Sequence, residues 1–76
     1  MSGEQLDATG MKCPLPVLKA RKRVKSLAPD TELEILATDP GAPKDFEAFC
    51  ESQGHRFVST HEDGDGVFHI RLIVSR

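Results

Sequence analysis

The segment VFHIRLIV, residues 67–74, alternates apolar and polar side chains along its length. A β-strand points successive side chains to opposite faces, so this alternation predicts a strand that buries one face and exposes the other. The segment TELEILA, residues 31–37, shows the same alternation, with Leu33, Ile35 and Ala37 on its apolar side. The apolar side of the first segment consists of Phe68, Ile70, Leu72 and Val74. A sheet with one apolar face needs a second layer that covers that face.

Two segments with helical periodicity can supply the covering layer. We expect a first helix over residues 14–27 and a second helix that begins at Pro43 and stops at Gly54, where glycine takes the left-handed conformation. At about 100° per residue, one apolar arc of the first helix carries Val17, Ala20, Val24, Leu27 and Ala28. The second helix carries Phe46, Phe49 and Cys50 on one face. The apolar face of each helix can pack against the apolar side of a sheet.

Two further strands complete the pattern. QLDA at 5–8 and HRFVSTH at 55–61 are short strand-like runs, and EDGDG at 62–66 is a turn signal before the last strand. The order of the elements predicts an α/β fold of the α+β type, a two-layer sandwich in which two helices cover one face of a mixed four-stranded sheet. We expect residues 1–76 to form one domain.

Chain length and composition exclude several classes of protein. A chain of 76 residues buries only about 60% of its unfolded surface and has no room for a deep active site. The sequence contains no apolar run of about 18 residues that could cross a membrane. Its first ten residues lack the basic and apolar regions of a secretory signal, so we expect a cytoplasmic monomer without membrane contact.

The two cysteines and three histidines do not form a recognisable metal site. CESQGH, residues 50–55, comes nearest to ligand spacing, but Cys13 lies far from it in the sequence. Neither a zinc signature nor the short spacing of a redox dithiol is present, so we expect no metal and no cofactor. The histidines at positions 55, 61 and 69 show no mutual spacing, and we expect them at the surface.

The segment KCPLP, residues 12–16, places a cysteine where the first helix should begin. With Cys13 at the N-cap, the prolines occupy positions where a missing N–H costs little, and the N–H of Leu15 could donate to a sulfur anion. A helix N-terminus contributes about 0.3–1 kcal/mol and up to about 2 kcal/mol when partly buried, which is about 0.2–1.5 pKa units, and Lys12 adds positive charge. A thiol pKa of about 8.5 would then fall to about 7.5, which suits a thiolate that exchanges sulfur without a histidine partner. The alternative is a cysteine used as a small buried apolar residue.

The first helix also carries a strong charge asymmetry. Residues 12–28 contain six basic residues and no acid, so a total charge of −2 leaves −8 on the rest of the chain. Leu15 falls opposite the apolar arc, beside Lys19 and Lys22. These three residues form either an ordinary solvated helix face or a docking surface for an acidic partner. Direct nucleic-acid binding is disfavoured, because the segment has no aromatic residue for base stacking and the whole chain is acidic.

Two longer segments resemble a known family. LDATGMKCPLPVLKARKRV, followed by ATDPGAPKDFEAFCESQGH, is similar to the TusA/SirA family of small sulfur-carrier proteins, which have a Cys-Pro-x-Pro motif between the first strand and the first helix. The resemblance covers residues 6–74 and includes the order of the elements. It implies the βαβαββ sandwich expected above, and a sulfurtransferase that works through a single cysteine.

The resemblance also implies roles for individual residues. Cys13 resembles the cysteine that accepts a persulfide sulfur from a cysteine desulfurase or rhodanese-type donor and passes it to an acceptor thiol. Pro14 and Pro16 match the prolines of the motif, and Asp7 and Asp39 match family positions. We expect turn and cap roles for both aspartates, because a carboxylate beside the thiol would oppose its ionisation.

The resemblance leaves the pathway and one alternative function open. Cys50 lies where many relatives also have a cysteine, but its helical phase with Phe46 and Phe49 indicates core packing. Carriers that resemble this chain serve transfer-RNA thiolation, sulfur supply to molybdenum cofactor enzymes and sulfur-compound oxidation, and the sequence does not select among these routes. The alternative is a non-catalytic regulatory or interaction module that binds protein or RNA through the basic first helix.

Overall fold

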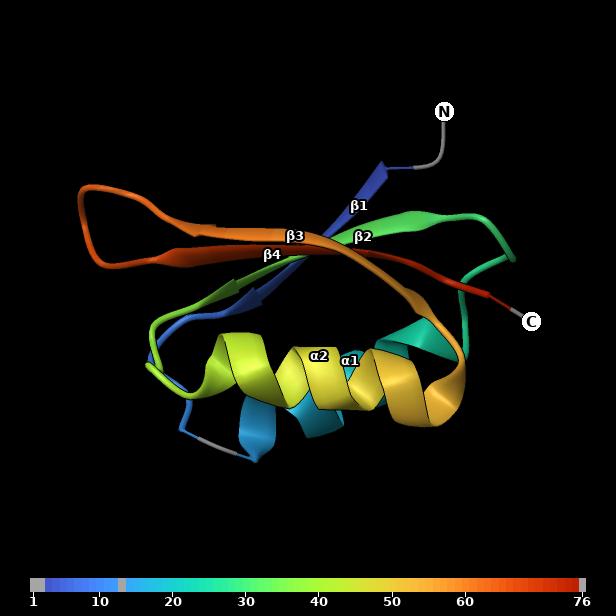
Figure 1. Cartoon of the computed structure of the whole chain (residues 1–76), viewed down its shortest axis with the longest axis horizontal. Helices are drawn as coiled ribbons and strands as arrows, with labels where there is room; N and C mark the ends of the chain where they lie inside the picture. Colours follow the sequence, from blue (N-terminus) through green and yellow to red (C-terminus); the bar gives the residue numbers. More distant parts are fainter. Residues whose placement is uncertain (1–2, 13, 76) are drawn as a thin grey trace.

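The predicted two-layer sandwich is confirmed by a computed structural model, which describes residues 3–12 and 14–75. The elements are β1 (Gly3–Ala8), α1 (Leu15–Val24), β2 (Glu32–Ala37), α2 (Ala42–Gln53), β3 (Arg56–Glu62) and β4 (Phe68–Ile73). The strands form one four-stranded mixed sheet in the order β1-β2-β4-β3, and α1 and α2 lie on the same side of it (Figure 1). The other side of the sheet is not covered by either helix.

The pairing of the strands decides which loops meet. β1 runs parallel to β2, with Ala8 opposite Ala37 at the last position of both strands. β2 and β3 each pair antiparallel with β4. Because the two parallel strands end together, the chain that leaves β1 towards α1 and the chain that leaves β2 towards α2 start side by side, at the same end of the molecule.

The core lies between the sheet and the helices, as the periodicity predicted. The predicted apolar positions that are buried are Leu33, Ile35, Ala37, Ile70, Leu72, Val74, Ala20, Val24, Phe46, Phe49 and Cys50. Val17, Leu27 and Phe68 are partly buried and pack against this core. The prediction was wrong for Ala28, which is exposed because α1 ends at Val24. Pro16 is fully buried, although it was not predicted to be.

The helix boundaries differ from the predicted ones by small shifts with local causes. α1 is shorter than predicted, because the N–H groups of Ser26 and Leu27 bond to carbonyls three residues back and close tight turns instead of helical ones. α2 begins one residue before Pro43, which still needs no N–H at that position. Gly54 ends α2 in the left-handed conformation, with a φ of 80°, as predicted.

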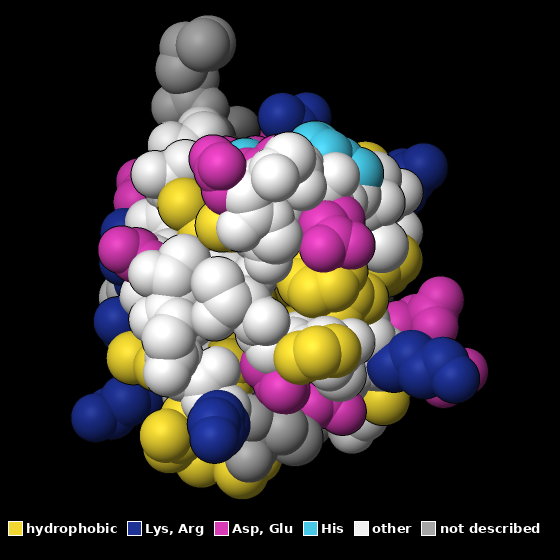
Figure 2. All heavy atoms as spheres, turned by 90° about the vertical axis from the view of Figure 1, so that its left-hand side faces the viewer, with side chains coloured by type: hydrophobic (Ala, Val, Ile, Leu, Met, Phe, Trp, Pro, Cys, Tyr) yellow, Lys and Arg dark blue, Asp and Glu magenta, His cyan; other side chains and the backbone are white. Residues whose placement is uncertain are grey.

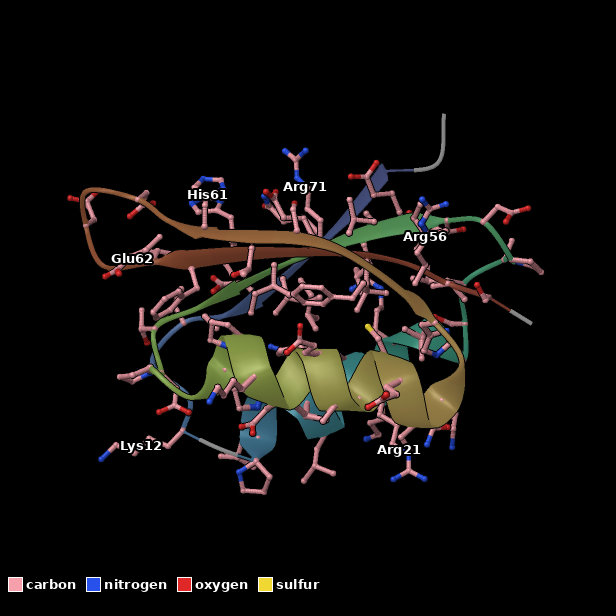
Figure 3. All side chains as sticks on the ribbon, in the orientation of Figure 1. Lys12, Arg21, Arg56, His61, Glu62 and Arg71 are labelled. Atoms are coloured by element: carbon pink, nitrogen blue, oxygen red, sulfur yellow. The ribbon has the colours of Figure 1, made fainter. Side chains whose placement is uncertain are left out.

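A bulge in β3 changes which side chains face the core. Phe57 lies opposite Leu72 on the core side, but the pairing is irregular between Phe57 and Ser59. Ser59 is therefore opposite Arg71, which points away from the helices (Figure 3). An extra residue in one strand reverses the faces of all residues that follow it. Val58, the residue at the bulge, has an exposed fraction of 46%.

The bulge brings two histidines together on the open face of the sheet. His61 lies opposite His69, and their rings stack with centroids 4.8 Å apart and planes 3° from parallel. The nitrogens of His69 contact two carboxylates: Nε2 is 2.8 Å from Asp63 and Nδ1 is 3.3 Å from Glu34. The histidines show no mutual spacing in the sequence, and the pairing of β3 with β4 brings these two together. The hydrogen bonds with Asp63 and then Glu34 raise the pKa of His69, and the bond with His69 lowers the pKa of Asp63 to about 2.

We predict that this cluster makes stability depend on pH in two windows. The raised pKa of His69 adds stability that is complete below the unfolded histidine pKa of about 6.5 and disappears as the pH rises through the folded value. The lowered pKa of Asp63 adds stability that is present above about pH 4 and disappears as the pH falls towards 2. The free energy of unfolding in urea should be measured for His69→Gln and for the natural chain from about pH 5 to 9. The loss of stability with rising pH that His69 causes should appear in the natural chain alone. An NMR titration that places the His69 midpoint at or below about 6.5 contradicts the prediction.

Candidate functional site

The predicted site centres on Cys13, which lies outside the described residues. Its described neighbours, Lys12 and Pro14, are both exposed. They lie at the end of the molecule where β1 and β2 finish, and Lys12 points outward from it (Figure 3). Figure 2 faces this end and shows hydrophobic side chains gathered along the helix layer beside Lys and Arg side chains. Lys12 and Pro14 therefore belong to an open surface and not to a deep pocket.

The start of α1 differs from the prediction by one residue. Pro14, with φ −98° and ψ 14°, is the N-cap, and Leu15 is the first helical residue, so Cys13 is not the N-cap. The N–H of Leu15 donates to the carbonyl of Lys12 at 2.8 Å, and this turn precedes the helix. The predicted donation of this N–H to a Cys13 thiolate concerns a residue outside the described ones and stays a prediction, in which the sulfur would share the N–H with the Lys12 carbonyl. The positive end of the helix dipole still begins within two residues of Cys13 in the sequence.

Residues 9–12, which we call loop 9–12, join β1 to the motif and are held by several hydrogen bonds. Asp7 Oδ1 accepts from both the N–H and the hydroxyl of Thr9, at 3.0 and 2.7 Å, and these bonds lower the pKa of Asp7. Gly10 has a φ of 79° and donates its N–H to the Thr38 hydroxyl oxygen at 2.8 Å. The predicted turn role of Asp7 is confirmed.

The predicted cap role of Asp39 is only partly correct. Its backbone carbonyl accepts the N–H of Ala42, the first residue of α2, at 3.0 Å. The N-cap of α2 is Gly41, and no side chain bonds to the cap within the part of the chain that the structure describes. Asp39 therefore shapes the turn before α2 through its backbone and not through its carboxylate.

The predicted docking residues are exposed, but one of them has a second contact. Leu15 has an exposed fraction of 53%, and Lys19 and Lys22 are exposed beside it. The Nζ of Lys19 donates to the backbone carbonyl of Asp7 at 2.9 Å, so its ammonium group also contacts the end of β1. Leu18, with an exposed fraction of 49%, extends the same surface. Leu18 was not among the predicted docking residues, although its helical phase already placed it outside the apolar arc.

A shallow groove between the two helices continues this surface. Its lining residues are Pro14, Val17, Leu18, Arg21, Asp45, Ala48, Phe49, Ser52 and Gln53. The groove begins within the motif, at Pro14, and has apolar side chains from both helices. The contribution of α2 was missed because a helix sequence alone does not show which flank meets a neighbouring helix. The groove gives an apolar strip beside the basic residues of α1.

Across residues 3–12 and 14–75, no three His, Cys, Asp or Glu side chains gather closely enough to hold a metal ion. The ring nitrogens of His69, which come nearest to such a cluster, contact Glu34 and Asp63 directly. Neither helix in these two ranges has the length and apolar character that a membrane span requires.

The architecture is shared with a solved structure. The crystal structure of a SirA-like protein from Desulfitobacterium hafniense matches this fold with a TM-score of 0.84, covering 96% of this chain and 99% of that chain at 22% identity. At that identity the match shows the fold alone. The chain thus has the same small α/β sandwich fold as that protein, and its sequence places a cysteine motif between the first strand and the first helix.

Sequence comparison identifies the family. The family model described as "Sulfurtransferase TusA" matches residues 4–74. A protein named "Sulfur carrier protein TusA" from Allochromatium vinosum is 42% identical over 69 residues, 91% of this chain and 90% of the relative. A protein of the same name from Pseudomonas aeruginosa is 42% identical over 67 residues, 87% of this chain and 85% of the relative. The chain belongs to the TusA family of sulfurtransferases.

We predict that the two cysteines differ strongly in reactivity. Cys50 is 1% exposed, and burial raises the pKa of its thiol to about 11, so it should resist alkylation while the chain is folded. Cys13 should react with iodoacetamide through a midpoint below about 8.5, because of the nearby helix N-terminus and Lys12. Peptide mapping after a pH series should find one alkylated cysteine in the native chain and two in urea. Equal labelling of both thiols without denaturant contradicts the prediction.

Proposed function

We propose that this chain is a sulfur carrier that accepts a persulfide sulfur on Cys13 and passes it to the thiol of a second protein. The observation that carries the proposal is the match of residues 4–74 to a sulfurtransferase family, together with the KCPLP motif at residues 12–16. The exposed position of Lys12 and Pro14 supports it, because a carrier must present its sulfur to two partners. The chain would act in the cytoplasm as one domain.

The chemistry of the proposed relay is a pair of thiol exchange steps. The Cys13 thiolate attacks the terminal sulfur of a persulfide on the donor, the sulfur–sulfur bond of the donor breaks, and the donor cysteine leaves as a thiolate. The acceptor thiolate then attacks the terminal sulfur on Cys13 in the same way and releases the Cys13 thiolate. Each step exchanges one sulfur–sulfur bond for another, so neither step needs an external oxidant or reductant.

Cys50 is unsuited to this role by its environment. It is 1% exposed among the aromatic side chains of α2, and burial raises the pKa of its thiol to about 11. A protonated thiol that no partner can reach neither attacks a persulfide nor presents one. We therefore assign the relay to Cys13 alone, with Lys12, Pro14, Leu15 and Pro16 as the residues that support its position and charge.

The proposed partners meet the carrier on the exposed face of α1. A cysteine desulfurase or rhodanese-type protein would act as donor, and a downstream thiol protein would act as acceptor. Leu15 and Leu18 offer apolar contacts, and Lys19 and Lys22 add the positive charge that favours an acidic partner surface. Transfer-RNA thiolation, molybdenum cofactor supply and sulfur-compound oxidation are the routes in which such a relay would serve.

We predict that sulfur loading depends on Cys13 and not on Cys50. After incubation with a cysteine desulfurase and cysteine, the natural chain should gain one sulfur that a reductant removes, and Cys13→Ser should gain none. Cys50→Ser should load normally but lose about 1–3 kcal/mol of unfolding free energy, because it buries a hydroxyl on an apolar face. Equal loss of loading in both variants, compared at the same folded fraction, would reveal a second essential thiol. A natural chain that binds partners but gains no sulfur would favour the regulatory alternative.

We predict that charge and apolar contact on α1 affect docking in different ways. Lys22→Glu should slow association with the donor several-fold at low salt, because surface charges act on encounter. Leu15→Ala should weaken affinity by about tenfold through faster dissociation, since it removes buried apolar area. Lys44→Glu on α2 reverses the same charge away from this face and serves as the control. Stopped-flow association at two salt concentrations is the measurement, and equal effects of Lys22→Glu and Lys44→Glu would place the docking surface elsewhere.

A further inference from the structure

One side chain holds the backbone of loop 9–12, and a second holds the end of β1 from which the loop leaves. Thr38, the first residue after β2, accepts a hydrogen bond on its hydroxyl oxygen from the N–H of Gly10 at 2.8 Å. Lys19, in the second turn of α1, donates from Nζ to the carbonyl of Asp7 at 2.9 Å. Loop 9–12 is therefore tied to the residue that follows β2, and the end of β1 is tied to α1.

Loop 9–12 leads directly to Cys13 in the sequence, so the conformation of the loop limits the positions that the cysteine can take. Gly10 has a φ of 79°, a conformation that residues with a Cβ rarely adopt, and this conformation presents its N–H to Thr38. The side chain of Met11 packs against the core, and its N–H donates to the carbonyl of Ala8 at 3.3 Å. These contacts give the segment before the motif one specific conformation, so it is not a free linker.

We propose that Thr38 and Lys19 are positioning residues for sulfur transfer at Cys13. The inference rests on the proposed role of Cys13 as sulfur acceptor. Neither residue is assigned a contact with the sulfur; they act through Gly10 and Asp7, by reducing the number of conformations available to the loop. A nucleophile presented in one orientation reacts faster at a bound persulfide than one that must first be ordered.

Thr38 gives the cleaner test, because it carries no charge. Thr38→Val keeps the size and branching of the side chain and removes the oxygen that accepts the Gly10 N–H. Thr38→Ser keeps that oxygen and should restore the natural behaviour. Lys19→Met removes both the donor and a positive charge, so Lys19→Arg, which retains both, is needed beside it. Lys25→Met, at the far end of α1, removes the same charge without the contact to β1 and controls for long-range electrostatics.

The experiment measures transfer from a persulfide-bearing donor as a function of donor concentration, with the pH profile of Cys13 alkylation on the same variants. Thr38→Val should lower the transfer rate at saturating donor by about two- to tenfold, the size of one net hydrogen bond, and leave the half-saturating donor concentration nearly unchanged. Its alkylation midpoint should move up towards that of an ordinary thiol. Thr38→Ser and Lys25→Met should match the natural chain, and Lys19→Arg should exceed Lys19→Met. Because both residues restrict the same stretch of chain, the double variant Thr38→Val/Lys19→Met should reduce the transfer rate by a smaller factor than the product of the two single reductions.

Several outcomes would overturn the inference. A natural transfer rate and natural alkylation midpoint in Thr38→Val would show that the hydrogen bond has no role beyond stability. A fall in rate that Thr38→Ser does not restore would point to a general packing effect. If no form of the chain accepts sulfur, the proposed function fails, and an unshifted alkylation midpoint in Thr38→Val would then separately reject the positioning role.

Discussion

The parallel pairing of β1 with β2 is the constraint on which the arrangement of the site depends. A parallel pair needs a crossover, and here α1 provides it, so the first helix must begin at the end of the sheet where β1 stops. This requirement places the KCPLP motif at that end. It also brings the loop after β2 next to the loop after β1, and the hydrogen bond between Gly10 and Thr38 follows from this proximity. An antiparallel pair would have separated the two loops by the length of the sheet.

Because the helices cover only one face of the sheet, the two faces carry different kinds of side chains. The covered face buries Cys50 and raises its thiol pKa, whereas the open face carries the His69 cluster and the ion pairs of Arg71 with Glu32 and Glu34. The proposed sulfur chemistry belongs to neither face but to the end of the sandwich. A chain of 76 residues cannot enclose a substrate, so a carrier of this size must depend on its partners for the walls of the reaction site.

Periodicity predicted the layers well because burial on one face repeats at every second or every third and fourth residue. It could not predict contacts that depend on how elements meet. α1 begins one residue later than predicted, at Leu15, whose N–H bonds to the Lys12 carbonyl in a turn that the periodicity of the sequence does not reveal. The stack of His61 on His69 needed a bulge whose position the sequence does not mark. The contacts of Lys19 and Thr38 join segments that are distant in the sequence, and no local pattern indicates them.

The bulge in β3 has a consequence for the behaviour of the protein in a crowded solution. β3 is an edge strand of the sheet, and it exposes Val58 among residues that favour extended structure. A regular edge of this kind would be a template for pairing with the edge of another molecule. A β-bulge disturbs the even spacing of the backbone N–H and C=O groups and increases the local twist, so the bulge between Phe57 and Ser59 makes this edge a poorer template for a second strand. The irregularity that pairs the two histidines thereby also protects the molecule against edge-to-edge aggregation.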